Sequence, residues 1–295
     1  MSTRTFWAIL PSLLLFALTS APFSGIAAAS DNSLRIGGST TLLPLVADAA
    51  SRFMDKYGTW DKVNPALPKE NIILYVTGGG SGFGITSTIN GAFDIGLTSR
   101  PLKEEEEKRL GEHNQYLISQ DCLAFAANAN SPLAKAVDNI TRDMVVKIVS
   151  GEAQTWQDVR SDLPAAPIVL ILRDVASGSS EMVKQMVLGD KGFSAGGIQV
   201  PSQGANLKRL EGNANAFGYL SSVIANSSDR LKVFKYDGVE PTNENIASGA
   251  YAITRPLILI VKGRPSPMVE AFVNYFYDEG REIIEEYGYV PVGRP

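Results

Sequence analysis

The chain has 295 residues, of which 44% are hydrophobic and 20% are charged. This is the composition of a soluble globular protein, and it excludes a chain that is disordered throughout. The formal net charge of −4 gives no global attraction to nucleic acid or to an acidic membrane surface, so we expect no nucleic-acid partner. An anion would have to be bound through local geometry.

The first residues of the chain predict a cleavable secretory signal, residues 1–29. Arg4 precedes an apolar run at residues 6–16, and small residues then lead to an expected cleavage after Ala29. The alternative is an uncleaved anchor, but polar residues and a proline interrupt the run, and a membrane span needs about 20 apolar residues. We therefore expect a periplasmic protein.

The chain has one cysteine and one histidine, and neither predicts a metal or redox centre. Cys122 lies in an apolar stretch far from the cleavage point, so we expect a buried structural thiol and no lipid anchor. His113 lies in a polar stretch, so we expect it on the surface. No cofactor or metal is expected.

From residue 34 onward, short β-rich runs alternate with helical patterns, which indicates an α/β fold. We expect strands at residues 34–37, 72–77, 93–99, 118–126, 167–173 and 257–261. We expect helices at residues 43–57, at residues 144–148, 181–188 and 268–276, and beginning at the acidic run 104–107.

Three junctions between a strand and a helix carry glycine and hydroxyl residues, at positions 37–41, 78–84 and 173–180. A helix N-terminus presents unpaired N–H groups and a partial positive charge, which favour an anion. Any one junction could merely cap its helix, but three in one chain, two accompanied by Arg100 or Arg173, favour an anion site. None matches a P-loop or a dinucleotide fingerprint, which disfavours nucleotide binding.

At these loops the sequence resembles the PstS-type phosphate-binding proteins of bacterial phosphate import. The matching segments, in family order, are GSTTLLP at 38–44, GGGSGFGI at 78–85, FDIGLTSRPL at 93–102, IVSGEAQTW at 148–156, SGS at 177–179, AFGYL at 216–220 and GYVP at 288–291.

The resemblance implies a two-lobed periplasmic binding protein of type II, in which each α/β lobe is a sheet flanked by helices and the ligand lies in the cleft between them. Lobe I would comprise residues 30–118 and 255–295, and lobe II residues 119–254. The site carried over by matched motifs comprises Ser39, Thr40, Thr41, Gly80, Ser81, Ser99, Arg100, Arg173, Ser177, Gly178 and Ser179.

The resemblance also implies that the protein is not an enzyme. It would bind inorganic phosphate in the periplasm and deliver it to an ATP-driven ABC permease in the inner membrane. We expect a monomer.

This chain departs from the family at the residue beside Ser99. Some members have an aspartate there, which accepts the proton of hydrogen phosphate and helps to exclude sulfate, whereas this chain has Arg100. The remaining candidates for that acceptor are Asp174, Glu181 and Asp121, and the sequence does not choose among them. We expect phosphate to remain the ligand, with weaker discrimination against sulfate.

Three alternatives stay open from the sequence. One is a carrier of another oxyanion, such as sulfate or molybdate, and another is a phosphate-sensing or surface-attachment role without transport. The third is a secreted phosphatase, which is disfavoured because a Ser-His-Asp triad would depend entirely on His113.

Overall fold

The computed structural model describes residues 32–294, so the predicted signal segment lies outside the described residues. None of the helices in this range combines the length and the apolar character that a membrane span requires.

Ten strands within residues 32–294 form one sheet, in the order β2-β1-β3-β11-β4-β8-β6-β7, and β12 and β9 also pair with β4. The strands are β1 Ser33–Gly38, β2 Ile73–Thr77, β3 Ile95–Thr98, β4 His113–Asn128, β6 Val169–Arg173, β7 Ile198–Val200, β8 Ala216–Ser221, β9 Leu231–Val233, β11 Thr254–Lys262 and β12 Val290–Pro291. A separate parallel pair consists of β5 Asn139–Ile140 and β10 Lys235–Tyr236.

The helices before the midpoint of the chain are α1 Leu43–Tyr57, α2 Trp60–Val63, α3 Ser81–Ile89, α4 Glu104–Leu110, α5 Pro132–Ala136 and α6 Arg142–Ser150. Those that follow are α7 Trp156–Val159, α8 Gly178–Val183, the π-helical segment η1 Lys184–Leu188, α9 Gln203–Glu211, α10 Ser222–Asn226, α11 Asn243–Ala247, α12 Pro267–Tyr275 and α13 Arg281–Glu286. The predicted α/β fold is confirmed.

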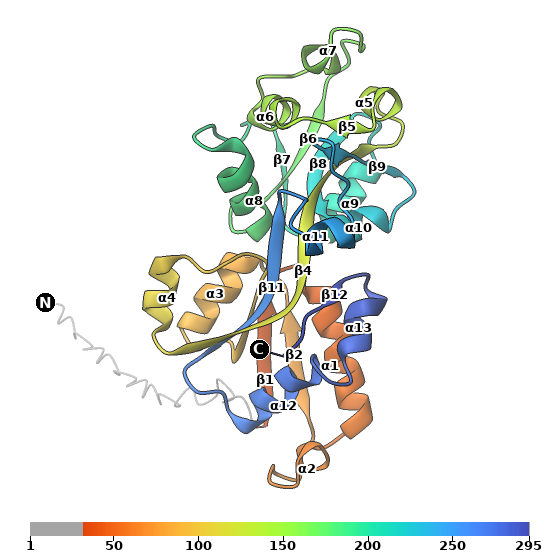
Figure 1. Ribbon diagram of the computed structural model, residues 1–295. Coiled ribbons are helices and arrows are strands. Elements are labelled where there is room, and N and C mark those ends of the chain that lie inside the picture. The colour runs from red at the N-terminus through yellow and green to blue at the C-terminus, as the bar shows by residue number, and fades with distance from the viewer. Residues whose placement is uncertain (1–31, 295) are drawn as a thin grey trace, which may run out of the picture. The chain divides into compact units, whose positions relative to one another are not determined.

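Two long strands, β4 and β11, connect the two halves of the sheet (Figure 1). The first part of β4 pairs with β11 in antiparallel register as far as Cys122, and its last part pairs with β8 from Leu123 onward. On its other edge β11 pairs with β3, which joins the parallel strands β1 and β2. One half of the sheet is therefore β2-β1-β3-β11 and the other is β8-β6-β7, with β4 passing through both.

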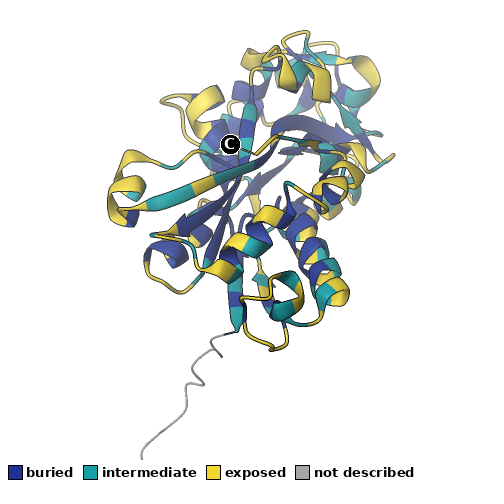
Figure 2. Ribbon diagram, turned by 60° about the horizontal axis from the view of Figure 1, so that its bottom comes forward, coloured by how far each residue is buried: buried dark blue, intermediate teal, exposed yellow. Residues whose placement is uncertain are grey.

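Most residues of the central strands are buried, and most exposed residues lie in loops and on the outer sides of helices (Figure 2). In β11, Leu257 and Leu259 pack in a core with α1, α12 and α13, whereas Ile258 and Ile260 pack with α3 and α4. Successive residues of a strand point to opposite faces, so this one apolar run serves two cores.

The helix predicted at residues 181–188 begins earlier and is not uniform. The Ser177 hydroxyl accepts the N–H of Ser180, so α8 already starts at Gly178, and the chain becomes π-helical from Lys184. Residues 178 and 179, which the sequence placed in a loop, are thus in the first turn of a helix. The strand predicted at residues 118–126 is longer in the structure and runs from 113 to 128.

Helix α3 lies so close to the sheet that Gly84 has no room for a side chain. A Cβ at this position would lie 2.7 Å from the carbonyl oxygen of Leu97 and 2.8 Å from that of Gly37, both of them backbone atoms. This close approach holds the start of α3, and therefore Ser81, against β1 and β3.

We expect Gly84→Ala to lower the free energy of unfolding by about 1–3 kcal/mol, because the backbone must shift to admit the methyl group. The matched control is Gly204→Ala in α9, where a Cβ would meet nothing within 4 Å. That change should be neutral or stabilise by about 0.5–1 kcal/mol. Urea unfolding of both variants measures the difference, and equal effects would contradict the close packing of α3.

Candidate functional site

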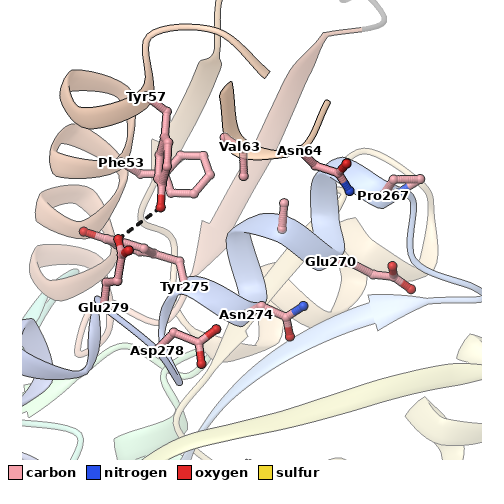
Figure 3. Close-up of a pocket in the computed structure, with 11 residues that line it drawn as sticks. Phe53, Tyr57, Val63, Asn64, Pro267, Glu270, Asn274, Tyr275, Asp278 and Glu279 are labelled. Carbon is pink, nitrogen blue, oxygen red and sulfur yellow. Dashed lines mark hydrogen bonds between the residues drawn. The ribbon is translucent and has the colours of Figure 1, made fainter. Parts of the chain in front are cut away.

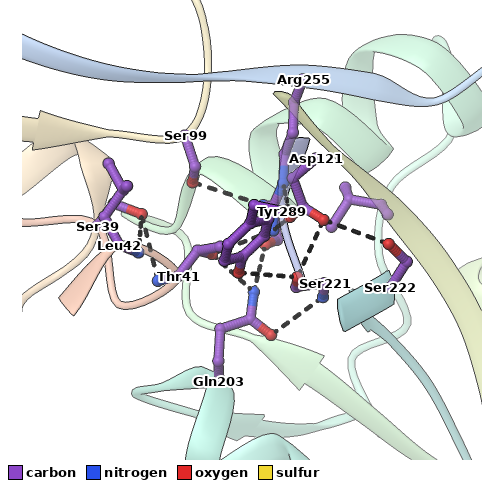
Figure 4. Close-up of polar contacts among 12 residues, drawn as sticks. Ser39, Thr41, Leu42, Ser99, Asp121, Gln203, Ser221, Ser222, Arg255 and Tyr289 are labelled. Carbon is purple, nitrogen blue, oxygen red and sulfur yellow. Dashed lines mark hydrogen bonds and ion pairs between the residues drawn. The ribbon is translucent and has the colours of Figure 1, made fainter. Parts of the chain in front are cut away.

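A cluster of buried polar side chains surrounds Arg255 at the start of β11 (Figure 4). The guanidinium donates from Nη2 to the Thr41 hydroxyl at 3.1 Å and from Nη1 to the Ser179 hydroxyl at 2.7 Å. Nη1 also lies 3.5 Å from the Ser99 hydroxyl. Three hydroxyls from distant parts of the chain therefore meet at one cation.

Asp121 on β4 holds Arg255 in this orientation. Its Oδ2 accepts from Nε at 2.9 Å and from Nη2 at 2.6 Å, and both side chains are 0% exposed. The other carboxylate oxygen accepts from the hydroxyls of Ser221 at 3.0 Å and Ser222 at 3.4 Å. A buried charge is stable only when it is paired and hydrogen-bonded in this way. Asp121 is thus fully engaged in orienting the guanidinium.

Gln203, the first residue of α9, completes the cluster. Its Nε2 donates to the Thr41 hydroxyl at 3.2 Å and to the Ser179 hydroxyl at 3.1 Å, and the residue is 1% exposed. Its Oε1 accepts the N–H of Ser221 at 3.4 Å. The amide therefore joins a hydroxyl before α1 to a hydroxyl in α8.

The loop before α3 and the start of α8 are in direct contact. A Cβ at Gly178 would lie 2.6 Å from the Ser81 hydroxyl and 3.1 Å from that of Ser99, so a larger residue would displace the Ser81 hydroxyl. Ser81 accepts the N–H of Ser99 at 3.0 Å. A Cβ at Gly80 would likewise lie 2.9 Å from the carbonyl oxygen of Ala176.

Two of the predicted hydroxyls accept main-chain N–H groups near the start of a helix. Ser39 accepts the N–H groups of Thr41 and Leu42 just before α1, at 3.3 and 3.5 Å. Ser177 caps α8 through the N–H of Ser180. Both are buried, as is Thr40.

Arg173 lies buried at the end of β6. Its Nε donates to the carbonyl of Val200 at 3.2 Å, and its Nη2 to the carbonyl of Pro201 at 3.1 Å and to Asp174 at 3.2 Å. Burial lowers the pKa of Arg173, and the nearby positive charge of Arg255 lowers it further. A second guanidinium therefore lies close enough to Arg255 to repel it.

Arg100 turns away from the cluster, although the sequence predicted that it would join the site. Its Nη1 and Nη2 each donate to Glu106 at 2.7 Å, and its Nε lies 3.1 Å from Glu181. Lys103 also pairs with Glu181, at 2.7 Å. Glu106 stands six residues later, in the first turn of α4, and it gives Arg100 a bidentate partner.

The three candidates for a proton acceptor are each engaged with a cation. Asp121 binds Arg255, and Glu181 binds Arg100. Asp174 accepts from Arg173 and from the N–H of Ala176.

Sequence reasoning missed Arg255 and Gln203. The only signal for Arg255 was a single charge before the apolar run 257–261, and it stands 214 residues from Thr41. Gln203 follows Ser202, which caps α9, and nothing in the local pattern separates it from an ordinary first-turn residue.

A separate pocket at α1 and α12 does not suit an anion (Figure 3). Glu270, Asp278 and Glu279 line it together with Phe53 and Tyr57, and the Tyr57 hydroxyl donates to Glu279 at 3.0 Å. Three carboxylates would repel a negatively charged ligand. Within residues 32–294 no group of three or more histidine, cysteine, aspartate or glutamate side chains is arranged to hold a metal ion.

Comparison with known proteins gives consistent matches over most of the chain. A family model described as a PBP superfamily domain matches residues 25–279. The phosphate-binding protein PstS of Bacillus subtilis is 29% identical over 269 residues, which cover 89% of this chain and 82% of that protein. PstS of Borreliella burgdorferi is 28% identical over 274 residues, which cover 89% of this chain and 91% of that protein.

One solved structure adds a ligand to this comparison. It is a protein from Clostridium perfringens, assigned as a phosphate ABC transporter substrate-binding protein and solved with bound phosphate. It matches with a TM-score of 0.76 and 26% sequence identity, covering 88% of this chain and 100% of that chain.

We expect Asp121→Asn to destabilise the protein by about 3–5 kcal/mol, because it leaves the Arg255 charge buried without a partner. The control is Asp48→Asn, which removes a partly exposed ion pair with Arg52 and should change stability by less than about 1 kcal/mol. Urea unfolding measures both. A loss at Asp121 no larger than the loss at Asp48 would mean that Arg255 does not need its carboxylate.

The ion pair of Glu106 predicts a pH dependence of stability. Burial favours a higher pKa for Glu106, but the bonds from Arg100 outweigh it and hold the pKa below its usual 4.5. A depressed carboxyl pKa gives stability that is present above the unfolded-state value and is lost as the pH falls below it.

Between pH 5 and pH 3, therefore, the wild type should lose more stability than Glu106→Gln, as measured by urea midpoints at each pH. Glu105→Gln, at an exposed neighbouring position, should behave like the wild type. Parallel acid losses in all three proteins would contradict this assignment.

Proposed function

We propose that this chain, which belongs to the PBP superfamily, binds inorganic phosphate in the periplasm and delivers it to an ATP-driven ABC permease. The matches to PstS proteins confirm the resemblance that the loop motifs indicated. Those relatives are named as binding proteins, and we propose the same non-enzymatic role here.

The observation that carries this proposal is the convergence of donors from both halves of the sheet on one buried point. Arg255 supplies the charge, and Thr41, Ser179 and Gln203 surround it with hydroxyl and amide groups. Guanidinium and hydroxyl donors give charge-assisted hydrogen bonds to a tetrahedral oxyanion, and such bonds are strongest where water is excluded.

The proposed site refines the set that the sequence predicted. Thr41, Ser99 and Ser179 would contact the ligand directly together with Arg255, and Gln203 would hold the Thr41 and Ser179 hydroxyls in place. Ser81, Gly80 and Gly178 would shape the contact between the two halves, and Ser39, Thr40 and Ser177 would order the helix starts, whose N–H groups also favour an anion. Arg173 would add positive potential, whereas Arg100 is left out of the ligand shell.

We further propose that the two lobes are residues 30–118 with 255–295, and residues 119–254, with the ligand cleft between them. This division is supported by β4, which pairs with β11 as far as Cys122 and with β8 from Leu123 onward. Thr41 and Ser99 would then belong to lobe I, and Ser179 and Gln203 to lobe II. Bringing the lobes together would complete the donor shell and remove the anion from water.

We also propose that the protein is exported to the periplasm. A signal at residues 1–29 would direct export to the periplasm, where we propose that the protein acts as a monomer. A carrier of another oxyanion remains the second candidate, because the donors recognise tetrahedral geometry rather than phosphorus.

Thermal unfolding of the purified protein with phosphate, sulfate, molybdate and chloride tests the proposal. A ligand bound only by the folded state raises the melting temperature, so phosphate should stabilise the wild type and chloride should not. If no oxyanion raised the melting temperature, the proposed function would be wrong.

Calorimetric titration of variants tests the site itself. Arg255→Lys keeps the charge but loses the planar fork, so phosphate affinity should fall at least tenfold, since a charged hydrogen bond is worth about 1.5–3 kcal/mol. Arg173→Ala should also weaken binding by at least tenfold through the lost positive potential. The control Arg160→Ala, at an exposed ion pair with Asp162, should leave affinity unchanged. Unaltered affinity in Arg255→Lys would remove this residue from the site.

A further inference from the structure

We infer that Gln203 determines the anion selectivity of the site by fixing the direction of the Thr41 and Ser179 hydroxyls. The inference rests on the proposed function, because it concerns which tetrahedral anion the same site prefers. It assigns to Gln203 a positioning role that neither the motifs nor the relatives' names indicate.

The hydroxyl oxygens of Thr41 and Ser179 each accept two hydrogen bonds. Thr41 Oγ1 accepts from Arg255 Nη2 at 3.1 Å and from Gln203 Nε2 at 3.2 Å. Ser179 Oγ accepts from Arg255 Nη1 at 2.7 Å and from Gln203 Nε2 at 3.1 Å. A hydroxyl has two acceptor lone pairs and one proton, so each of these oxygens has only its proton left to offer. Both hydroxyls therefore act as donors toward a ligand.

The hydrogen-bond partners of the Gln203 side-chain amide fix its orientation. Nε2 carries two protons, which match the two hydroxyls, while Oε1 accepts the main-chain N–H of Ser221. Turning the amide over would place Nε2 against that N–H, two donors facing each other in a residue that is 1% exposed. The surroundings of Gln203 thus select the orientation that forces both hydroxyls to donate.

The carboxylates near the cluster already accept hydrogen bonds from other groups. Both oxygens of Asp121 already accept two bonds each, from Ser221, Ser222 and Arg255. Each oxygen of Asp174 also accepts a bond. Asp121 and Asp174 therefore have no oxygen without a donor, and Glu181, the third candidate, is paired with Arg100 and Lys103.

This arrangement of donors and acceptors defines the kind of anion that fits the site. Hydrogen phosphate and sulfate carry the same charge and shape, but hydrogen phosphate bears one proton that needs an acceptor. The Thr41 and Ser179 hydroxyls can bind the unprotonated oxygens of either anion, but they offer no lone pair to that proton. Gln203 is therefore the residue that keeps the site tuned to a tetrahedral dianion in general rather than to hydrogen phosphate in particular.

The test is a pair of titrations at pH 8, in which phosphate and sulfate are each titrated into the wild type and into Gln203→Met. Met has nearly the shape of Gln but donates no hydrogen bond, so in the variant one lone pair on each hydroxyl becomes free to accept the proton of hydrogen phosphate. Gln199→Met, at an exposed position on β7, is the matched control.

In the wild type we expect the two dissociation constants to lie within about tenfold of each other. In Gln203→Met we expect the ratio to shift toward phosphate by about tenfold, which corresponds to about one neutral hydrogen bond. Gln199→Met should keep the wild-type ratio. Melting temperatures of the ligand-free variants show whether each one folds.

Two results would overturn the inference while leaving the proposed function standing. One is a preference of the wild type for phosphate over sulfate of more than about a hundredfold, a measurement that does not depend on any variant folding. The other is a folded Gln203→Met variant with an unchanged ratio. If neither anion bound the wild type, the proposed function and this inference would both fail.

Discussion

The buried ion pair between Arg255 and Asp121 links the two strands on which both halves of the sheet depend. The residues stand directly opposite each other in the antiparallel register of β11 and β4, and neither side chain is exposed. Taking two charges out of water is costly, and good geometry together with additional hydrogen bonds is needed to offset that penalty. The hydroxyls of Ser221 and Ser222 on one side, and of Thr41 and Ser179 on the other, supply those bonds. The groups that stabilise the pair are thus also the groups that form the candidate site.

This arrangement decides how the site would recognise an anion. Arg255 is balanced by Asp121, and Arg173 by Asp174, so these four groups bring no net charge to the cluster. Recognition then depends on where the donors point, in keeping with a chain whose overall charge is negative. Fixed donors in a site without water make stronger hydrogen bonds than the same groups do in solution.

The sequence predicted those parts of the site that have a local signature. Glycine and hydroxyl residues at the ends of strands identified the loops that contribute Thr41, Ser99 and Ser179, because such residues are needed where a strand meets a helix. Arg100 was placed in the site because it follows the strand predicted to end at Ser99. The direction of its side chain was not predictable, because that direction depends on a bidentate partner in the first turn of α4.

Arg255 and Gln203 could not be found in this way, because their roles come from pairing across long sequence distances. Arg255 meets Asp121 across 134 residues and Thr41 across 214. Only the register of β4 against β11 places them together, and register is a property of two strands rather than of one.

The hydrophobic pattern cannot set that register by itself. In most half-buried strands a slip of one residue would turn apolar side chains to water, and this penalty fixes the pairing. In β11, Leu257 and Ile258 lie on opposite faces and both faces are buried, so a slip would exchange one apolar face for the other. The same slip would carry Arg255 away from Asp121 and leave two buried charges without partners, a loss of several kcal/mol. The ion pair therefore favours the observed register of residues 254–257, before the irregularity between Leu257 and Ile258, and it fixes the point at which the guanidinium meets the hydroxyls of Thr41 and Ser179.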